Sequence, residues 1–444
     1  MSDFLERGKF SCALGGALTT IAGLHKVVPI VHAAGGCAAA LSNTYNLASG
    51  YRGTGYCGGT MIPTSNISEK NIVFGGEERL EEQIEQTIQI LDADLYVVVT
   101  GCQVEIIGDD AVGIASRYKE HNVIGASTPG FLGNTYKGYD AVLKAMIQNV
   151  IKKEEIKEDL TINVLGVVPG HDVFYRGNLE EIKRLLQSIG VKANTFFGTG
   201  EEIKDIKKYG SATLNVVFSK TAGIEAAMEF EKIHDIPYII TELPIGPSGT
   251  KDFLRLIGKY FGVDPVLIES VIHSENKVYY SYLERLVDIY ADIDFGRYGI
   301  VIADNYYAFS IIRFLANDLG WIPHFTSIHD LEDLSLQEEY TKLFDNLTSE
   351  TKPIVRYIQN ASLVIKEIRN TWEVNHNEKY YNSLEPAFVI GSGIERGLAE
   401  KLNAGFLSVA FPVSNRVVLS KGYVGFKGGI TLIEDLISVI VAPR

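Results

Sequence analysis

The sequence predicts an α/β protein with three Rossmann-like αβα domains and mainly parallel sheets. Short apolar runs that are typical of strands alternate with amphipathic helical segments along the chain. These strand-like runs are apolar throughout, as expected for parallel strands that helices cover on both faces. With 444 residues, the chain is too long for one compact core, which indicates two or three domains.

The clearest helix is predicted for residues 77–91, which read EERLEEQIEQTIQIL. Glutamates cover one side of this segment, and the opposite face carries Leu80, Ile84, Ile88 and Leu91. The predicted strands are LYVVVT (95–100), TINVLGVV (161–168), ATLNVVF (212–218), YGIVIAD (298–304) and AFVIGS (387–392).

Two breaks in composition suggest where the domains meet. The first is the charged stretch IKKEEIKED (151–159), and the second is DIDFGRYG (292–299). We therefore expect an N-terminal αβα domain over residues 1–158 that carries all the cysteines, a middle αβα domain over 159–293 and a C-terminal αβα domain over 294–444.

Composition and charge exclude several classes of function. Lysine and arginine number 41 and aspartate and glutamate 55, so the formal net charge is −14. This charge would repel a phosphate backbone, so no nucleic acid partner is expected. The longest apolar stretch, VVPIVHAAGGCAAAL, is too short to cross a bilayer and contains Pro29 and His32. The N-terminus resembles no signal peptide, so we expect a cytoplasmic protein without membrane contact.

The four cysteines lie in the first quarter of the chain, at Cys12, Cys37, Cys57 and Cys102. A reducing cytoplasm argues against a disulfide framework, which leaves buried thiols or metal ligands. Three of them stand beside glycines or other small residues, in FSCALGG (10–16), VHAAGGC (31–37) and TGCQVEIIGDD (100–110). Such neighbours allow a bulky iron–sulfur cluster to approach the thiolates. Three ligands from one chain leave a site that a partner chain could complete.

Other site chemistry has little support in the sequence. Glycine-rich turns end several predicted strands, as in AGGCAAA (34–40), VVPGHDVFYRGN (167–178) and IGSGIERG (390–397). None matches a dinucleotide or P-loop fingerprint, so tight turns explain them better than a nucleotide site does. No GxSxG, HxxxH or HExxH pattern occurs. Ordinary surface or core positions are expected for His171, His234, His273, His324, His329 and His376.

Several motifs in the same order resemble the nitrogenase component 1 family, which includes cofactor-assembly subunits and nitrogenase-like reductases. Beside the three cysteine segments, the motifs are SNISEKNIVFGGEERL (65–80), STPGFLGNTYKGYD (127–140), VVPGHDVFYRGNLEEIKRLL (167–186), FVIGSGIERG (388–397) and VAFPVSNR (409–416). The resemblance covers nearly the whole chain. It implies three αβα domains in each subunit and a cluster shared between two homologous subunits.

The resemblance assigns cluster ligands residue by residue. Cys12, Cys37 and Cys102 match the three cysteine ligands of α-type chains. Cys57 has three open readings: a fourth ligand, a β-type substitute for Cys12, or an inert thiol. Cys102 would end a strand at the subunit interface, where Gly101 gives it room. Asp109 and Asp110 are expected to cap the helix that follows.

The chain departs from the catalytic pattern of the family at two positions. In α-type chains, one cysteine and one histidine hold the active-site metal cofactor. Here Ser219 follows the strand LNVVFS in place of the cysteine, and the segment SVAFPVSN offers Ala410 and Phe411 in place of the histidine. A hydroxyl is a poor iron ligand beside a thiolate. The segments ELPIGPSGTKDFL (242–254) and VAFPVSN resemble β-type chains.

The resemblance therefore implies a β-like oxidoreductase subunit with α-like cysteine spacing. It would co-ligate an interfacial four-iron or eight-iron cluster, which receives electrons from an ATP-dependent iron protein and passes them to an active site in a sister chain. The expected assembly is a hetero-oligomer of the α2β2 kind. The alternatives are a scaffold for cofactor assembly, a reductase of a substrate other than dinitrogen, and an α/β binding protein whose cysteines have no ligand role. The resemblance names no substrate and no catalytic residue for this chain.

Overall fold

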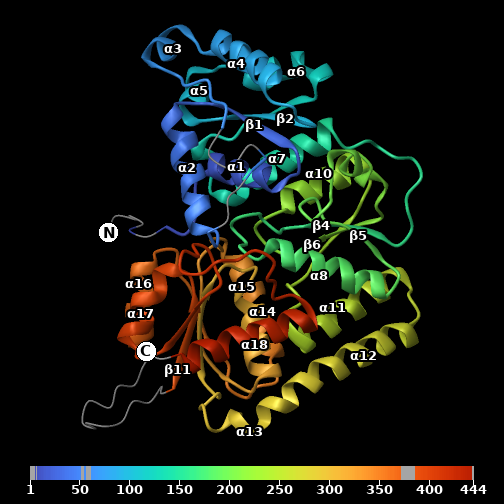
Figure 1. The fold of residues 1–444 in the computed structure, drawn as a ribbon, viewed down its shortest axis with the longest axis vertical. Helices are drawn as coiled ribbons and strands as arrows, with labels where there is room; N and C mark the ends of the chain where they lie inside the picture. Colours follow the sequence, from blue (N-terminus) through green and yellow to red (C-terminus); the bar gives the residue numbers. More distant parts are fainter. Residues whose placement is uncertain (1–5, 7, 52–54, 57–61, 372–385, 443–444) are drawn as a thin grey trace.

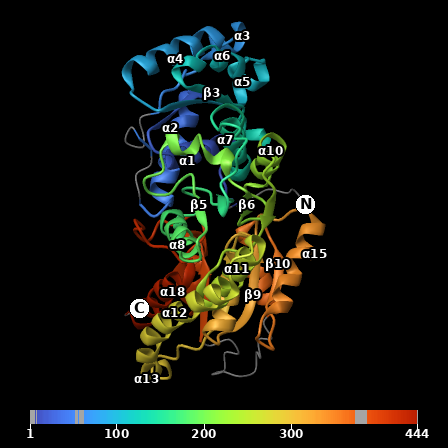
Figure 2. The ribbon, with the colours of Figure 1, turned by 90° about the vertical axis from the view of Figure 1, so that its right-hand side faces the viewer.

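The computed structural model describes residues 6, 8–51, 55–56, 62–371 and 386–442. Its strands form three parallel sheets, which lie one after another along the chain. Figure 1 shows the first unit at one end of the molecule and the third towards the other, where they adjoin along one side, with the middle unit packed beside both. Figure 2 shows the first unit at the same end from the side. The predicted fold class is confirmed. Each sheet lies within one predicted domain, and the boundaries near residues 158 and 293 stay predictions.

The first sheet has the order β1-β2-β3. Its strands are β1 (Val27–His32), β2 (Leu95–Thr100) and β3 (Val123–Ala126). Its helices are α1 (Ala13–Gly23), α2 (Gly35–Ala48), α3 (Glu69–Phe74), α4 (Glu77–Ile90), α5 (Cys102–Ile107), α6 (Ala111–Arg117) and α7 (Thr135–Asn149), with short turns η1 (Lys119–His121) and η2 (Gly130–Leu132). The apolar stretch VVPIVHAAGGCAAAL forms β1 and the start of α2.

The middle sheet has the order β5-β4-β6-β7. Its strands are β4 (Thr161–Leu165), β5 (Lys192–Asn194), β6 (Leu214–Val217) and β7 (Tyr238–Ile240). Its helices are α8 (Tyr175–Ser188), α9 (Ile203–Ile206), α10 (Ile224–His234), α11 (Gly246–Phe261), α12 (Pro265–Leu283) and α13 (Val287–Tyr290), with turns η3 (Tyr209–Ser211) and η4 (Glu284–Leu286). The predicted strand 161–168 ends at Leu165 because Gly166 turns the chain with a φ of +82°.

The third sheet has the order β10-β9-β8-β11-β12. Its strands are β8 (Tyr298–Ala303), β9 (Ile322–Ile328), β10 (Ile354–Tyr357), β11 (Ala387–Gly391) and β12 (Gly405–Ser408). Its helices are α14 (Ala308–Arg313), the π-helical η5 (Phe314–Asp318), α15 (Leu334–Leu343), α16 (Ala361–Thr371), α17 (Arg396–Lys401) and α18 (Gly425–Val441), with turns η6 (Phe344–Asn346) and η7 (Gly393–Glu395). Helix α18 returns to the middle unit and contacts α8, α11 and α12.

One large hydrophobic core runs through all three units. The outer face of the first sheet has its own apolar cluster under α4 and α6, and the outer face of the third sheet has another under α16 and α17. Burial on both faces explains why the strands read as continuous apolar runs. Helices α1 and α7 pack so closely that a side-chain carbon on Gly16 would lie 1.9 Å from the carbonyl oxygen of Thr135.

A buried carboxyl joins the first unit to the middle one. Asp140 of α7 accepts hydrogen bonds from the N–H groups of Gly223 (3.2 Å) and Ala226 (3.0 Å) at the start of α10. Burial raises the pKa of Asp140 from its ordinary 3.8 to about 7, although the two N–H groups oppose this shift.

This shift predicts a pH dependence of stability. Since the folded protein holds the Asp140 proton more tightly than the unfolded chain does, its contribution is full below pH 3.8 and is lost as the pH rises to about 7. In that window, the free energy of unfolding should fall by roughly 1.4 kcal/mol per pH unit relative to an Asp140→Asn variant. Urea unfolding of both proteins across the range measures the difference, and parallel pH profiles would contradict the prediction.

Candidate functional site

The three cysteines expected as ligands stand at the beginnings of three helices. Cys12 is the N-cap of α1, Cys37 lies in the first turn of α2, and Cys102 is the first residue of α5. Helices α2 and α5 follow the neighbouring strands β1 and β2, which end together where His32 pairs with Thr100. The topology therefore places Cys37 and Cys102 at the same edge of the first sheet.

Cys12 and Cys102 meet at Gly130, in the loop after β3. The N–H of Gly130 donates a hydrogen bond to Sγ of Cys102 at 3.1 Å. A side-chain carbon at position 130 would lie 2.9 Å from that sulfur and 3.7 Å from Sγ of Cys12. A backbone bridge between Cys12 and Asn134 holds the N-terminal segment against this loop. The two thiols therefore converge on a position that leaves no room for a side chain.

The third predicted ligand, Cys37, lies at the turn beside this pair. A side-chain carbon on Gly101 would lie 2.6 Å from Cβ of Ala33, so glycine allows the turn after β2 to pack on the turn after β1. Cys12, Cys37 and Cys102 are all free thiols and partly exposed. Cys57 lies outside the described residues, and its possible role stays a prediction.

The described part of the chain contains no group of three His, Cys, Asp or Glu side chains arranged to hold a metal ion. The arrangement thus differs from a complete mononuclear site. An iron–sulfur cluster spreads its ligands over several iron atoms, so thiols at adjoining turns fit a cluster better than they fit one ion. The partial exposure of all three thiols leaves them accessible to a second chain.

A buried histidine–aspartate pair supports the helix that carries Cys102. His32 places Nε2 3.1 Å from Asp109 Oδ2 and Nδ1 2.9 Å from Ser65 Oγ. Asp109 also accepts the N–H of Gly76 at 3.1 Å. Burial lowers the pKa of His32, and the neighbouring Asp109 carboxylate opposes this change. No local pattern predicts this pairing, because 77 residues separate the two side chains.

The capping prediction is confirmed for one of the two aspartates. Asp110 is the N-cap of α6 and accepts the N–H of Gly113 at 2.9 Å. For Asp109 the prediction is wrong, because its carboxylate turns inward to His32 and Gly76. Glu105 of α5, which sequence reasoning missed, accepts hydrogen bonds from the hydroxyls of Thr100 and Ser127. It ties the Cys102 helix to the ends of β2 and β3.

Large apolar side chains are exposed around the Cys102 helix. Phe74 is 81% exposed, Ile106 74% and Phe131 66%. Helix α3, which ends at Phe74, contacts α5, and Phe131 directly follows Gly130. Figure 1 shows α3 and α5 together at the end of the molecule away from the third unit. Contiguous exposed apolar patches are typical of protein–protein contact surfaces. We call it the apolar rim, and its members are Ile72, Val73, Phe74, Ile106, Phe131 and Leu132.

The family model for nitrogenase component 1 type oxidoreductases matches residues 12–441, nearly the entire chain. This chain belongs to the nitrogenase component 1 type oxidoreductases. It is an oxidoreductase subunit, as its cysteine segments indicated. Membership implies iron–sulfur chemistry, and the convergence of Cys12 and Cys102 on Gly130 fits such a group.

Relatives of this nitrogenase component 1 type chain include β chains and an assembly protein. The nitrogenase molybdenum-iron protein beta chain of Methanococcus maripaludis is 23% identical, over 97% of this chain and 93% of the relative. The nitrogenase iron-molybdenum cofactor biosynthesis protein NifE of the same organism is 29% identical, over 60% of this chain and 55% of the relative. A solved structure described as "Nitrogenase Cp1 at pH 6.5" has the same fold, with a TM-score of 0.78 and 20% identity, over 99% of this chain and 94% of that one.

The positions that hold a cofactor in α-type chains are engaged otherwise in this component 1 type chain. Ser219 is buried, and its Oγ accepts hydrogen bonds from the N–H groups of Thr221 and Ala222, both at 3.1 Å. Ala410 and Phe411 are also buried. The hydroxyl of Ser219 therefore closes a turn after β6, and no thiol or imidazole stands at any of these three positions.

Aromatic rings fill the junction between the units beside Phe411. The Phe411 ring stacks on His171 at a centroid distance of 5.1 Å, and Phe10 stacks on His171 at 5.0 Å. The hydroxyl of Tyr136 donates to Asp304 at 3.1 Å beside the same imidazole. His171 is thus a buried packing residue, as expected, and so are His234 and His329. His376 lies outside the described residues.

No helix in the described ranges is both long and apolar enough to span a bilayer.

Proposed function

We propose that this chain is the β-like subunit of a component 1 complex and co-ligates an iron–sulfur cluster with a homologous sister chain. Cys12, Cys37 and Cys102 supply its ligands from this side. The cluster is of the four-iron or eight-iron type and belongs to an α2β2-like assembly. An ATP-dependent iron protein delivers the electrons, and the active site lies mainly in the sister chain.

The observation that carries the proposal is the convergence of Cys12 and Cys102 on Gly130. Glycine at position 130 lets the backbone of this loop approach both sulfurs, which brings two of the predicted ligands and a backbone donor to one place. The N–H of Gly130 at 3.1 Å from Cys102 Sγ adds a donor to a ligand sulfur. Hydrogen bonds to ligand sulfurs are one means by which a protein sets a cluster's potential.

The apolar rim supports a shared site. Phe131 stands one residue after Gly130 and is 66% exposed, so a chain that completes the ligand set would also cover this ring. Burying exposed apolar surface is the main driving force of association between proteins. When bound, the cluster supplies one-electron transfer. The residues of this chain hold its ligands, exclude water on one side and present the surface to the sister chain.

The placement of the active site in a sister chain rests on Ser219, Ala410 and Phe411. A serine hydroxyl that already accepts two backbone hydrogen bonds has little capacity left for iron. Phe411 offers no ligand atom, and its ring packs against His171. These side chains support a partner role for this subunit.

Anaerobic expression tests the proposal. The chain is produced alone and together with a homologous α-type chain, and iron and acid-labile sulfide are measured per chain. We expect roughly equal iron and sulfide, which appear or rise sharply on co-expression. Folded protein without iron in both preparations would refute the shared cluster. Iron well above one cluster per pair of chains would place a second metal centre in the complex.

A scaffold for cofactor assembly is the second candidate, and the similarity to NifE favours it. Such a subunit would carry a precursor cluster without turnover. The replacement of both cofactor ligands fits a scaffold and a β subunit alike. Steady substrate reduction by the purified complex with its iron protein would rule out the scaffold.

A further inference from the structure

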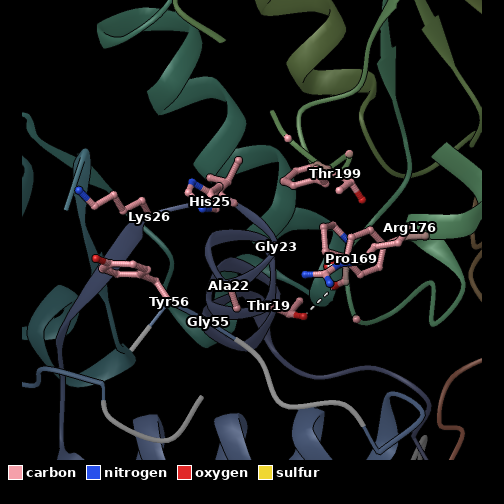
Figure 3. A pocket seen from close by; sticks show the side chains of 16 residues that line it. Thr19, Ala22, Gly23, His25, Lys26, Gly55, Tyr56, Pro169, Arg176 and Thr199 are labelled. Carbon is pink, nitrogen blue, oxygen red and sulfur yellow. Dashed lines mark hydrogen bonds between the residues drawn. The ribbon is translucent and has the colours of Figure 1, made fainter. Parts of the chain in front are cut away.

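A pocket lies between the first and middle units, away from the cysteines. Its volume is about 320 Å³, which is enough for a small metabolite. The floor consists of Ala22 and Gly23 at the end of α1, and one wall comes from Pro169 and Gly170 in the turn before α8 together with Tyr175 and Arg176 in the first turn of α8. Figure 3 shows Lys26 and Arg176 on opposite sides of this floor. The hydroxyl of Thr19 donates to the carbonyl oxygen of Pro169 at 2.7 Å and holds the two units together there.

The lining of the pocket is basic in an acidic protein. Its described residues include His25, Lys26 and Arg176 and no aspartate or glutamate, although the chain has a net charge of −14. The positive charge of Lys26 is paired with two carboxylates outside the pocket lining, since its Nζ lies 2.9 Å from Asp92 and 3.7 Å from Asp94. The uncompensated positive charge of the pocket is therefore that of Arg176.

The guanidinium of Arg176 has N–H groups beyond the one that donates a hydrogen bond within the described residues. Its Nε donates to the hydroxyl of Tyr175 at 3.1 Å, and among the described residues no carboxylate forms an ion pair with its guanidinium. Gly198, Thr199 and Gly200 also line the pocket, on the same side as Arg176 (Figure 3), and their backbone N–H groups donate to no acceptor in the described residues. A guanidinium fork and consecutive free N–H groups are the donors that bind phosphate oxygens.

The floor of the pocket offers hydrogen-bond acceptors, which suit the hydroxyl groups of a ligand and not its phosphate. Helix α1 ends at Gly23, where the carbonyl of Ile21 accepts the N–H of Leu24 at 3.0 Å and the carbonyls of Ala22 and Gly23 accept no backbone N–H from the described residues. Carbonyl oxygens accept hydrogen bonds from hydroxyl groups. The ring of Phe197 lines the same pocket and offers a flat apolar wall. Donors at the sides and acceptors at the floor call for a ligand that is both anionic and hydroxylated.

We propose that this pocket binds a small phosphate monoester with a hydroxylated body, of the sugar phosphate class. The phosphate lies between Arg176 and the N–H groups of the turn 198–200, and the hydroxyls face the end of α1. Because the pocket spans two units, an occupied pocket stabilises their relative placement. The inference is independent of the cluster and of the subunit role proposed above.

Calorimetric titration of the purified full-length chain tests this site with ribose 5-phosphate as the probe. Ribose and inorganic phosphate are titrated separately. We expect ribose 5-phosphate to bind more tightly than either, and Arg176→Gln to weaken it about tenfold, because one charge-assisted hydrogen-bonding group is lost. Ala22→Phe, which fills the floor and keeps every charge, should weaken binding at least as much.

Arg396→Gln is the matched control. It removes an exposed arginine of α17 that pairs with Glu400, far from the pocket in the third unit, and binding should not change. Thermal unfolding and iron content of every variant report whether the fold and the cluster persist. Lack of binding by the unaltered chain, equal affinity for inorganic phosphate, or affinity that is unchanged in both Arg176→Gln and Ala22→Phe would each overturn the proposal.

Discussion

Cys12→Ala and Cys102→Ala are each expected to remove most of the iron from the co-expressed complex while the chain stays folded. The two thiols are partly exposed, so their loss leaves small defects in packing, whereas a cluster loses a ligand on the side where this chain holds it. Cys37→Ala should act in the same direction. Iron and acid-labile sulfide per chain, measured beside circular dichroism, report the outcome.

Two further variants make this test specific. Ser116→Ala removes a hydroxyl that donates only within its own helix, so iron should stay at the level of the unaltered chain. Gly130→Ala keeps every thiol but places a carbon 2.9 Å from Cys102 Sγ, so iron should fall or its spectrum should change. Full iron in both Cys12→Ala and Cys102→Ala would show that these cysteines are inert thiols in this family member.

Lys9→Met is expected to destabilise the protein by about 3–5 kcal/mol. Nζ of Lys9 lies 2.9 Å from Oε1 of Glu395, and the two side chains are only 1% and 3% exposed. Removing the lysine leaves a buried carboxylate without its counter-charge, which is far more costly than the loss of a surface pair. Lys9 stands three residues before Cys12, so the pair also anchors the cysteine segment to the third unit. Urea unfolding measures the change.

The matched control is Lys192→Met, which breaks an ion pair with Glu158 whose side chains are 61% and 47% exposed. Its effect should stay below about 1 kcal/mol. The double variant Lys9→Met/Glu395→Gln removes both buried charges and keeps an acceptor for Ser392, so it should recover much of the loss. Equal effects of Lys9→Met and Lys192→Met would contradict the account of the buried pair.

Local patterns were enough to predict most of the regular structure. The strand 95–100 and the helix 77–91 agree with β2 and α4 to within one residue. The strand at 161–168 was predicted too long, since the turn that follows β4 is also apolar and buried. The strand at 212–218 was predicted to begin two residues before β6 and to end one residue after it. The prediction of helix capping could not separate Asp109 from Asp110, because both have the right residue type beside the helix start.

The candidate site was only partly predictable. Three cysteines in glycine-rich segments indicated a cluster, and the order of motifs indicated the family. The contact between Gly130 and Cys102 could not be predicted, since 28 residues separate them and the contact is a hydrogen bond from a backbone N–H to sulfur. The His32–Asp109 pair and the Lys9–Glu395 pair were missed for the same reason.

The sequence by itself determined the class of fold, the family and the candidate ligands of this protein, because periodicity, residue type and motif order are properties of neighbouring residues. Tertiary structure decided which of those residues meet. The adjacency of β1 and β2 places Cys37 and Cys102 at one edge, and the loop after β3 brings Gly130 between Cys102 and Cys12. The pocket proposed to bind a phosphate monoester likewise exists only where α1 meets the start of α8 and the turn before it. Such contacts join segments that are distant in the chain, so they depend on how the helices and sheets pack and not on any local sequence pattern.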